Sequence, residues 1–458
     1  MPAPTNWNTI AVGDAGVAWI QVGAGIDRPN NNYPFCQNLR ERFYLDTNKY
    51  IEYPNGLRLV VMNMPSLRTV ASGIWVRAGS ICEDEGNNGI AHFIEHMIFK
   101  GTDKLTAFEI ADNFESMGAA VNAFTGKENT CYFAKSTDEY GKKCFELLSN
   151  IFFDSAFDET EMEKERGVVV EEFNMTEDST EDICFDLLAT ALYDKHPLGK
   201  SILGPIENIK NFNRADIAKF IESFYTAKNI VISIAGNVSL EQADKWVREY
   251  FLPRVSPTKT TVYKDTAHSS CTTHLERFKE QFEQCNFALG YPTVPFYHKD
   301  YNTQSVVNMI LGGGMSSRLF QHIREQKGLA YSVYSGQTSY AANGSLNIIC
   351  NTNPANYIAA KNAAQEVVND LIKGGITDNE WNRAKTQIKS AFLFGQESCQ
   401  SMMISAGKLM LAADKVFDVD QKIAEIQNVT KKDGNAFVKK YMSGDCLCSA
   451  YVGKEVKN

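Results

Sequence analysis

The chain has 458 residues, more than one hydrophobic core usually supports, so we expect at least two domains. Hydrophobic residues make up 44% of it and charged residues 22%, a composition that is typical of globular proteins and argues against intrinsic disorder. The net charge of -9 argues against nucleic acid as a partner, and no apolar run of about 18 residues is present to predict a membrane span.

The cysteines and the N-terminal residues indicate in which cellular compartment the protein acts. Eleven cysteines are scattered without a Cys-x-x-Cys pair, which suits reduced thiols in a reducing environment. The first residues lack the basic and apolar regions of a secretory signal, and the first arginine is Arg28, which argues against an Arg-rich transit peptide. We therefore expect a protein that is not secreted, and that acts where it is made unless a targeting segment is absent from this chain.

The elements of the first half follow from apolar periodicity. Residues 1–48 are rich in Asn, Gly and Pro and are predicted to be an irregular extension. "LRLVVMNM" and "ASGIWVRAG" predict strands, and "AAVNAFTGKENTCYFAKS" predicts a strand pair. "NGIAHFIEHMIFKG", "AFEIADNFESMG" and "EYGKKCFELLSNIFF" predict helices, and so does the acidic segment 158–193 as one long helix.

A second copy of this order follows residue 280. "NFALGYPTV" predicts a strand and "AYSVYSGQTSYAANGSLNIICNT" a strand pair, while "YNTQSVVNMILGG", "SSRLFQHIREQKG" and "NYIAAKNAAQEVVNDLIKGG" predict helices. We therefore expect an α+β protein of two related halves, each an antiparallel sheet flanked by helices. The predicted domains are 49–253 and 279–458, joined by a Pro-, Thr- and Ser-rich linker at 254–278.

The segment "GIAHFIEHMIFKGT", residues 89–102, carries three polar side chains in an apolar run. His92, Glu95 and His96 stand at positions i, i+3 and i+4, so a helix places them on one face. Burying such groups without partners costs about 2 kcal/mol or more for each. Two imidazoles on adjacent turns suit a catalytic zinc ion, which takes three protein ligands and a water, and His-x-x-Glu-His is a known zinc motif. The alternative is a polar patch that arose by coincidence.

The third ligand has to come from another element, and the acidic segment 158–193 is the best candidate. Glu165 and Glu172 are seven residues apart, which places them two turns along one helix face. Glu172 would complete a His2Glu site, and Glu165 could hydrogen-bond a ligand imidazole. A solvated helix face is the alternative for any glutamate in so acidic a segment.

"NNGIAHFIEHMIFKGT" and "KERGVVVEEFNMTED" closely resemble the pitrilysin-type (inverzincin) metallopeptidases. Within that family the chain is most similar to the catalytic subunit of the mitochondrial processing peptidase and its bacterial relatives. "ALYDKHPLGKSILGP" and "LGGGMSSRLFQHIREQKGLAYSVYS" also match, and the resemblance runs from about residue 50 to the C-terminus. It implies two α+β halves that close like a clamshell around a chamber in which peptides are cut.

The resemblance also implies the roles of the site residues. One zinc ion per chain would be bound by His92, His96 and Glu172, with Glu95 as the general base. Glu165 would be a supporting acid on the same helix as Glu172.

The implied substrate contacts come from both halves. Asn122 and Ala123, in "VNAFTG", match the strand edge along which family substrates lie as an added strand. Arg324 and Tyr331, in "REQKGLAY", match a pair that reaches the substrate backbone and the oxyanion, with ordinary packing and surface charge as the alternative. Phe99 matches an aromatic wall beside the residue after the cut.

Two acidic residues match positions of the processing peptidase that bind a substrate arginine two residues before the cleaved bond. Asp182 and Asp186 are at i and i+4, so a helix places them on one face, where they could clamp one guanidinium. The processing peptidase more typically has Glu at the first position, and the shorter Asp182 departs from that pattern. Two exposed acids on a helix are the alternative.

The expected function is therefore a zinc-dependent endopeptidase that cleaves peptides, presequences or leader peptides and favours a basic residue before the cut. The main alternative is a structural or peptide-binding subunit of the same fold, as in respiratory-complex cores, and a third is a hydrolase acting on something other than peptide. Relatives are homodimers, heterodimers with a related subunit, or monomers. The resemblance implies that this chain acts in the cytoplasm if it is bacterial and in the mitochondrial matrix or a related organelle if it is eukaryotic.

Overall fold

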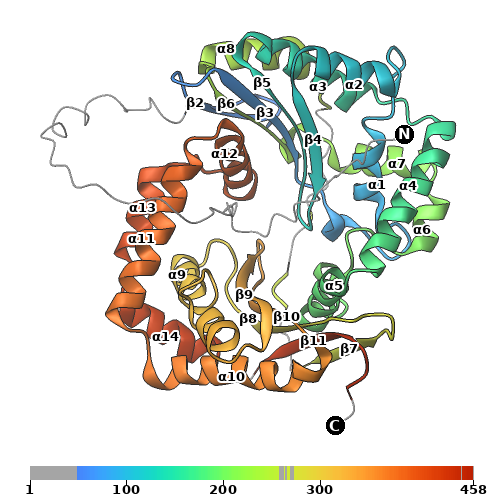
Figure 1. Cartoon of the computed structure of the whole chain (residues 1–458). Coiled ribbons are helices and arrows are strands. Elements are labelled where there is room, and N and C mark those ends of the chain that lie inside the picture. The colour runs from blue at the N-terminus through green and yellow to red at the C-terminus, as the bar shows by residue number, and fades with distance from the viewer. Residues whose placement is uncertain (1–48, 257–262, 264–265, 269–272, 445, 457–458) are drawn as a thin grey trace, which may run out of the picture.

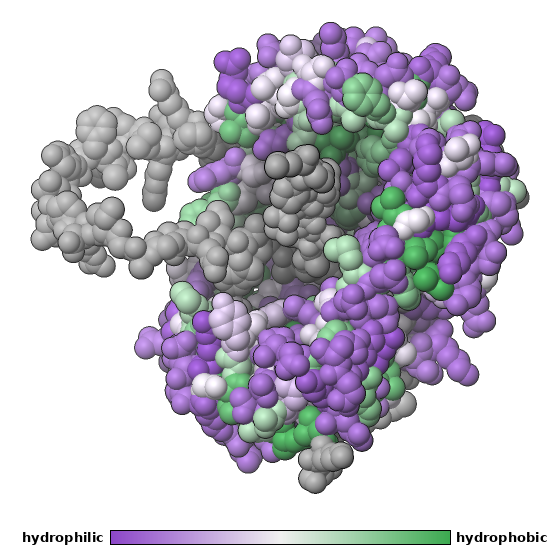
Figure 2. Space-filling model, turned by 45° about the vertical axis from the view of Figure 1, so that its right-hand side comes forward, coloured by the Kyte–Doolittle hydropathy of each residue, from purple (hydrophilic) through white to green (hydrophobic). Residues whose placement is uncertain are grey.

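The computed structural model describes residues 49–256, 263, 266–268, 273–444 and 446–456. Within them the chain forms two sheets, each covered by helices, and the two halves face one another like a clamshell (Figure 1). In the space-filling view the visible outer surface of both halves is mostly hydrophilic (Figure 2). The expected α+β fold of two related halves is confirmed, while the predicted extension at residues 1–48 lies outside the described residues.

The first sheet has six strands in the order β1-β2-β6-β3-β5-β4. Its strands pair antiparallel except β2 and β6, which run parallel. The inner strands are almost continuously buried because helices lie on both faces, whereas β4 forms an edge. The strands are β1 (Lys49–Glu52), β2 (Arg58–Asn63), β3 (Thr69–Val76), β4 (Ala120–Thr125), β5 (Thr130–Thr137) and β6 (Ile230–Gly236).

The second sheet has five strands in the order β7-β11-β8-β10-β9. It too contains one parallel pair, β7 with β11. The prediction that both sheets are antiparallel is therefore wrong for one strand pair in each sheet. Strand β7 lies inside the segment predicted as a linker, and β9 forms the opposite edge. The strands are β7 (His274–Phe278), β8 (Cys285–Pro292), β9 (Ala330–Ser339), β10 (Gly344–Thr352) and β11 (Cys448–Gly453).

Helices surround both sheets (Figure 1). In the first half they are α1 (Ile90–Met97), α2 (Ala107–Ser116), α3 (Gly141–Asp154), α4 (Glu159–Glu177), α5 (Thr180–Tyr193), α6 (Ile206–Asn211), α7 (Arg214–Phe224) and α8 (Leu240–Trp246). In the second half they are α9 (Tyr301–Leu311), α10 (Tyr357–Gly374), α11 (Asp378–Gly395), α12 (Cys399–Ala413), α13 (Val419–Asn428) and α14 (Lys431–Tyr441).

One helix of each half packs on the sheet of the other half. Helix α12 of the second half packs on β2, β3 and β6, and α5 of the first half packs on β8 and β11 (Figure 1). Trp75 of β3 is fully buried under α12 and donates a hydrogen bond to Ser233 (2.9 Å). Gly407 of α12 permits this approach, because a Cβ there would lie 2.1 Å from Nε1 of Trp75. The exchanged helices join the halves through buried apolar surface.

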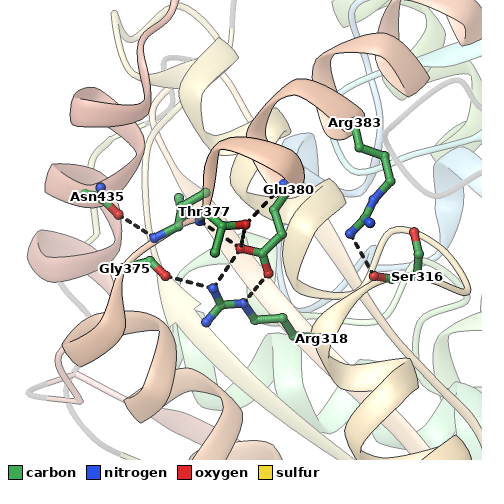
Figure 3. A network of polar contacts seen from close by, with 8 residues as sticks. Ser316, Arg318, Gly375, Thr377, Glu380, Arg383 and Asn435 are labelled. Atoms are coloured by element: carbon green, nitrogen blue, oxygen red, sulfur yellow. Dashed lines mark hydrogen bonds and ion pairs between the residues drawn. The ribbon is translucent and has the colours of Figure 1, made fainter.

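The loop at residues 312–317 is anchored to α11, in part through an ion pair of Arg318, the first residue of the helix that follows this loop (Figure 3). Arg318 donates from Nε and Nη2 to the two carboxylate oxygens of Glu380, at 2.7 and 2.9 Å. Glu380 also accepts from Thr377 in a capping box at the start of α11. Arg383 reaches the carbonyl of Ser316 (3.0 Å), so two arginine contacts tie the loop to one helix.

One helix prediction was wrong in its extent, and another is confirmed as a helix but differs in helix type. The segment predicted as one helix at 158–193 is broken between α4 and α5, because Ser179 adopts an extended conformation and its side chain accepts from the N–H of Asp182 to begin a new helix. The helix predicted at 316–328 contains a π-helix, Phe320–Gln326. None of the described helices is both long and apolar enough to cross a bilayer.

Candidate active site

Helix α1 is held at its N-terminus by a buried carboxylate. Glu83 accepts hydrogen bonds from the backbone N–H groups of Gly89 and Ala91 and from the side-chain amide of Asn88, each at 2.8 Å. Gly89 has a φ of 102°, a left-handed conformation that a residue without a Cβ adopts readily. A negative charge at this end of a helix is also favourable. These contacts fix how α1 presents its polar face.

Three side chains from α1 and α4 converge on one point. Nε2 of His92 and Nε2 of His96 lie 3.6 and 3.3 Å from Oε2 of Glu172. Among the described residues these three form a group whose ligand atoms all lie within 4.8 Å of one another. Zinc bonds of about 2.0–2.1 Å place tetrahedral ligand atoms roughly 3.3 Å apart, so the group fits one zinc ion in size and in chemistry.

The orientation of His96 is fixed from behind. Its Nδ1 lies 2.9 Å from Oε1 of Glu165, which is buried, and Nζ of Lys100 lies 2.6 Å from the other carboxylate oxygen. Burial would raise the pKa of Glu165, but the hydrogen bonds from His96 and Lys100 outweigh it and lower that pKa. An ionised Glu165 accepts a hydrogen bond from Nδ1–H of His96, which leaves Nε2 of that ring without a proton and free to bind a metal.

When no metal is bound, the pKa of His92 is lowered and the pKa of His96 is raised. Burial and the neighbouring His96 lower the pKa of His92 to about 4. Burial would also lower the pKa of His96, but hydrogen bonds to Glu165 and Glu172 raise it to about 9. Since a ligand imidazole has to be neutral, a metal ion would displace the proton that His96 shares with Glu172.

Glu95 lies beside this cluster and has a different partner. Its Oε2 accepts a hydrogen bond of 2.6 Å from the hydroxyl of Thr125, at the end of β4. Burial raises the pKa of Glu95 to about 6, although the Thr125 hydrogen bond acts in the opposite direction. A carboxylate with such a pKa can both accept and return a proton near neutral pH.

The residues predicted for the substrate strand lie next to this cluster. Asn122 and Ala123 are on β4, an edge strand of the first sheet that contacts α1. Within the described residues β4 pairs only with β5, which leaves its other edge open. Phe99 follows the end of α1, is half-buried and packs against the core of the first half.

Arg324 and Tyr331 come together in the second half. The guanidinium of Arg324 lies over the ring of Tyr331, 5.1 Å from its centroid, and Tyr331 is 80% exposed. Tyr331 belongs to β9, the edge strand of the second sheet. Among the described residues no hydrogen bond or ion pair joins these two side chains to His92, His96 or Glu172.

Asp182 and Asp186 both lie on α5, but their surroundings differ. Asp182 is exposed near the start of the helix. Asp186 is largely enclosed, and burial raises its pKa while the positive charge of Lys127 acts in the opposite direction. Lys127 itself donates to the carbonyl of Lys200. Asp186 therefore already has a cation of this chain nearby, whereas Asp182 is open to solvent.

Four residues that the sequence analysis did not single out support the site. Glu83 holds α1, Thr125 bonds Glu95, Lys100 pairs with Glu165, and Lys127 lies near Asp186. Only Lys100 carried a local signal, because it stands one helical turn after His96. The others come from turns and strand ends, where apolar periodicity says nothing about side-chain partners.

The fold and the cluster define a two-halved protein with a His2Glu group on two neighbouring helices that could hold a metal ion. Residues 58–206 match the family model described as Insulinase (Peptidase family M16), and residues 211–388 match the Peptidase M16 inactive domain. The chain is 39% identical to the uncharacterized zinc protease YmxG of Bacillus subtilis over 85% of this chain and 95% of that protein. It is 32% identical to an uncharacterized zinc protease of Mycobacterium leprae over 88% and 92%. The chain therefore belongs to peptidase family M16.

Solved structures agree on the fold. A protease from Helicobacter pylori superposes with a TM-score of 0.83 at 23% identity, covering 90% of this chain and 100% of that one. A peptidase M16 inactive domain from Pseudomonas fluorescens gives 0.82 at 21%, covering 90% and 99%. The resemblance to the pitrilysin-type family is confirmed, and the three candidate metal ligands all lie in the part that matches the first of the two family models.

Proposed function

We propose that this chain is a zinc-dependent endopeptidase that binds one zinc ion at His92, His96 and Glu172. The observation that carries the proposal is that one potential ligand atom from each of these three side chains lies within 4.8 Å of the other two, with Glu95 beside them. Zinc bound there would supply a Lewis acid that polarises a peptide carbonyl and acidifies water. The M16 relatives named zinc proteases are consistent with this chemistry.

Glu95 is the proposed general base. With a pKa of about 6, its carboxylate is mostly ionised at neutral pH and can take a proton from the attacking water. The same group can then deliver the proton to the leaving amine. The hydrogen bond from Thr125 holds one carboxylate oxygen and leaves the other for the reacting atoms.

Glu165 and Lys100 are proposed to hold the site without touching the substrate. Glu165 orients His96 through Nδ1, and Lys100 keeps Glu165 ionised. Outer partners of this kind raise the basicity of a ligand imidazole and fix its direction.

The open edge of β4 is the proposed binding site for the substrate backbone. A peptide that adds as a strand beside Asn122 and Ala123 forms main-chain hydrogen bonds and lies next to α1 and Glu95. Arg324 and Tyr331 are proposed to contact the backbone and carbonyl oxygen from the second half. The exposure of Tyr331 leaves its hydroxyl free for a ligand.

Specificity is proposed to come from Phe99 and the two acids of α5. Phe99 would contact the residue after the cut. Asp182 would attract a basic residue before it, and Asp186 would contribute less, because Lys127 offsets its charge. Basic presequences or leader peptides are therefore the proposed substrate class, and the chain is proposed to act as a homodimer or with a related subunit.

The decisive experiment is cleavage of a mixed peptide library by the purified chain, with products identified by mass spectrometry. We expect internal cuts that cease with a chelator and return with zinc, and a bias toward a basic residue before the cut. Zinc binding without any cleavage would favour a peptide-binding subunit. Cleavage that a chelator leaves unchanged would overturn the zinc mechanism.

A further inference from the structure

The C-terminal half of α4 carries Glu172 but contributes little to the core. Of the 19 residues of α4, the buried ones are Met162, Glu165 and Val169. After Val169 every residue through Glu177 is half-buried or exposed, and Met175 is 72% exposed. Apolar packing therefore restrains this segment less than it restrains the start of the helix.

Polar contacts from the second half hold the end of this segment. Glu177, the last residue of α4, accepts a bidentate pair from Arg277 of β7, with 2.8 Å between Nη1 and Oε1. Lys279, just beyond β7, lies 3.0 Å from Oε2 of Glu177 and also donates to its main-chain carbonyl. The cluster thus combines a bidentate ion pair with a cation that caps the helix C-terminus, and both arrangements are favourable.

The chain crosses from one half to the other at this point. Three residues after Glu177, α5 begins at Thr180 and packs on the second sheet, where Thr180 donates to Asn286 (2.8 Å). Burial would raise the pKa of Glu177, but Arg277 and Lys279 outweigh it and lower that pKa. The contact is therefore favourable with Glu177 ionised, and it lies less than two helical turns beyond Glu172.

We propose that Arg277 and Lys279 are positioning residues of the metal site, which clamp the end of α4 so that the second half holds Glu172 opposite His92 and His96. The inference rests on the proposed zinc site. In this arrangement the half without metal ligands still contributes to metal binding. The coupling acts through the helix backbone, since neither cation contacts the three ligands.

The test compares zinc dissociation constants, measured by competition with a chromogenic chelator, for the wild-type chain and the double variant Arg277→Ala/Lys279→Ala. We expect zinc binding roughly three- to tenfold weaker in the double variant, the range for losing a partly exposed ion cluster. In the zinc-free proteins, hydrogen exchange of residues 170–177 should be faster in the double variant, with α1 unchanged.

A matched control removes two ion pairs elsewhere. Lys245→Ala/Arg248→Ala breaks the pairs with Glu241 and Asp244 on α8, at 2.9 and 2.8 Å, and should leave zinc binding unchanged. The exchange Arg277→Lys/Lys279→Arg keeps both charges and should restore most of the affinity. Should the double variant not fold, Lys279→Ala alone provides the same comparison, with a smaller expected loss of about threefold.

The outcomes separate this inference from the proposed function. A wild-type chain that binds no zinc overturns both. A wild-type chain that binds zinc, with a double variant that binds it equally tightly and exchanges at the same rate, overturns the clamp alone. Weaker binding in the α8 control as well would attribute the loss to general destabilisation and would also overturn the clamp.

Discussion

Nδ1 of His96 lies 2.9 Å from the buried carboxylate of Glu165, one of the shortest polar contacts between α1 and α4. The contact leaves Nε2 of the same ring facing Glu172 at 3.3 Å. Two glutamates two turns apart on one helix thus bind the two nitrogens of one imidazole. The pair decides which nitrogen is available to a metal, and it is the basis of the first prediction.

Glu165→Gln should weaken zinc binding by about 10- to 100-fold, the usual effect of removing an outer partner of a ligand histidine. The amide keeps the size of the side chain but loses the charge that holds the proton on Nδ1 of His96, and Lys100 loses its ion pair. Chelator competition measures the change. Glu161→Gln, which removes the exposed pair with Lys164 on the same helix, is the control and should have no effect.

Glu95→Gln should keep zinc and lose peptide cleavage by about 10²- to 10⁴-fold, because the amide cannot accept a proton. The hydrogen bond from Thr125 can persist to the amide oxygen, so the local structure should be retained. The measurement is the cleavage rate of a library-derived peptide, with bound zinc quantified in the same sample. Near wild-type cleavage at full zinc occupancy would exclude Glu95 as the base.

The Arg318–Glu380 pair predicts a dependence of stability on pH (Figure 3). Burial would raise the pKa of Glu380, but Arg318 and Thr377 outweigh it and lower that pKa from 4.5 to about 2. Because the folded value is depressed, the stabilisation is complete above about pH 4.5 and is lost as the pH falls toward 2. Because solvent screening weakens a partly exposed pair, we expect it to contribute roughly 1–2 kcal/mol of stability, less than the pKa shift alone would give.

Glu380→Gln should therefore lower the free energy of unfolding at pH 7, and the difference from wild type should shrink as the pH falls from 4.5 toward 2. Urea unfolding at a series of pH values measures it. Asp378→Asn, which removes an exposed partner of Lys431, should change stability by less than about 0.5 kcal/mol. A difference between Glu380→Gln and wild type that stays constant with pH would contradict the assignment.

Asp182→Asn should reduce cleavage of peptides with a basic residue before the cut by about fivefold, the effect of losing one exposed ion pair. Cleavage of peptides with a neutral residue there should be unchanged. The ratio of kcat/KM for the two peptides is the measurement. Asp112→Asn, an exposed acid on α2, is the control, and an equal loss for both peptides would argue against a specific contact.

Gly407→Ala should destabilise the chain by about 3 kcal/mol or more, since the added Cβ would lie 2.1 Å from Nε1 of the buried Trp75. The change acts at the interface where α12 covers the first sheet. Gly167→Ala is the matched control in the middle of α4, where nothing lies within 4 Å, and should stabilise the helix by roughly 0.5–1 kcal/mol. Thermal unfolding of both variants checks the pair.

The sequence alone predicted what depends on local geometry. The spacing of His92, Glu95 and His96 places them on one face of any α-helix, because that geometry follows from 3.6 residues per turn. The same argument placed Glu165 and Glu172 on one face of their helix. The α+β order of both halves also agrees with the structure, and so does the edge position of "VNAFTG", which the family resemblance implied.

Only the tertiary structure decided how distant segments meet. The exchange of α5 and α12 between the sheets and the approach of Lys127 to Asp186 leave no trace in apolar periodicity. The physical reason is that helix and strand formation depend on hydrogen bonds and side-chain spacing within short segments. Which helix faces which, and so which carboxylate completes a metal site, depends on packing among residues that are far apart in the chain.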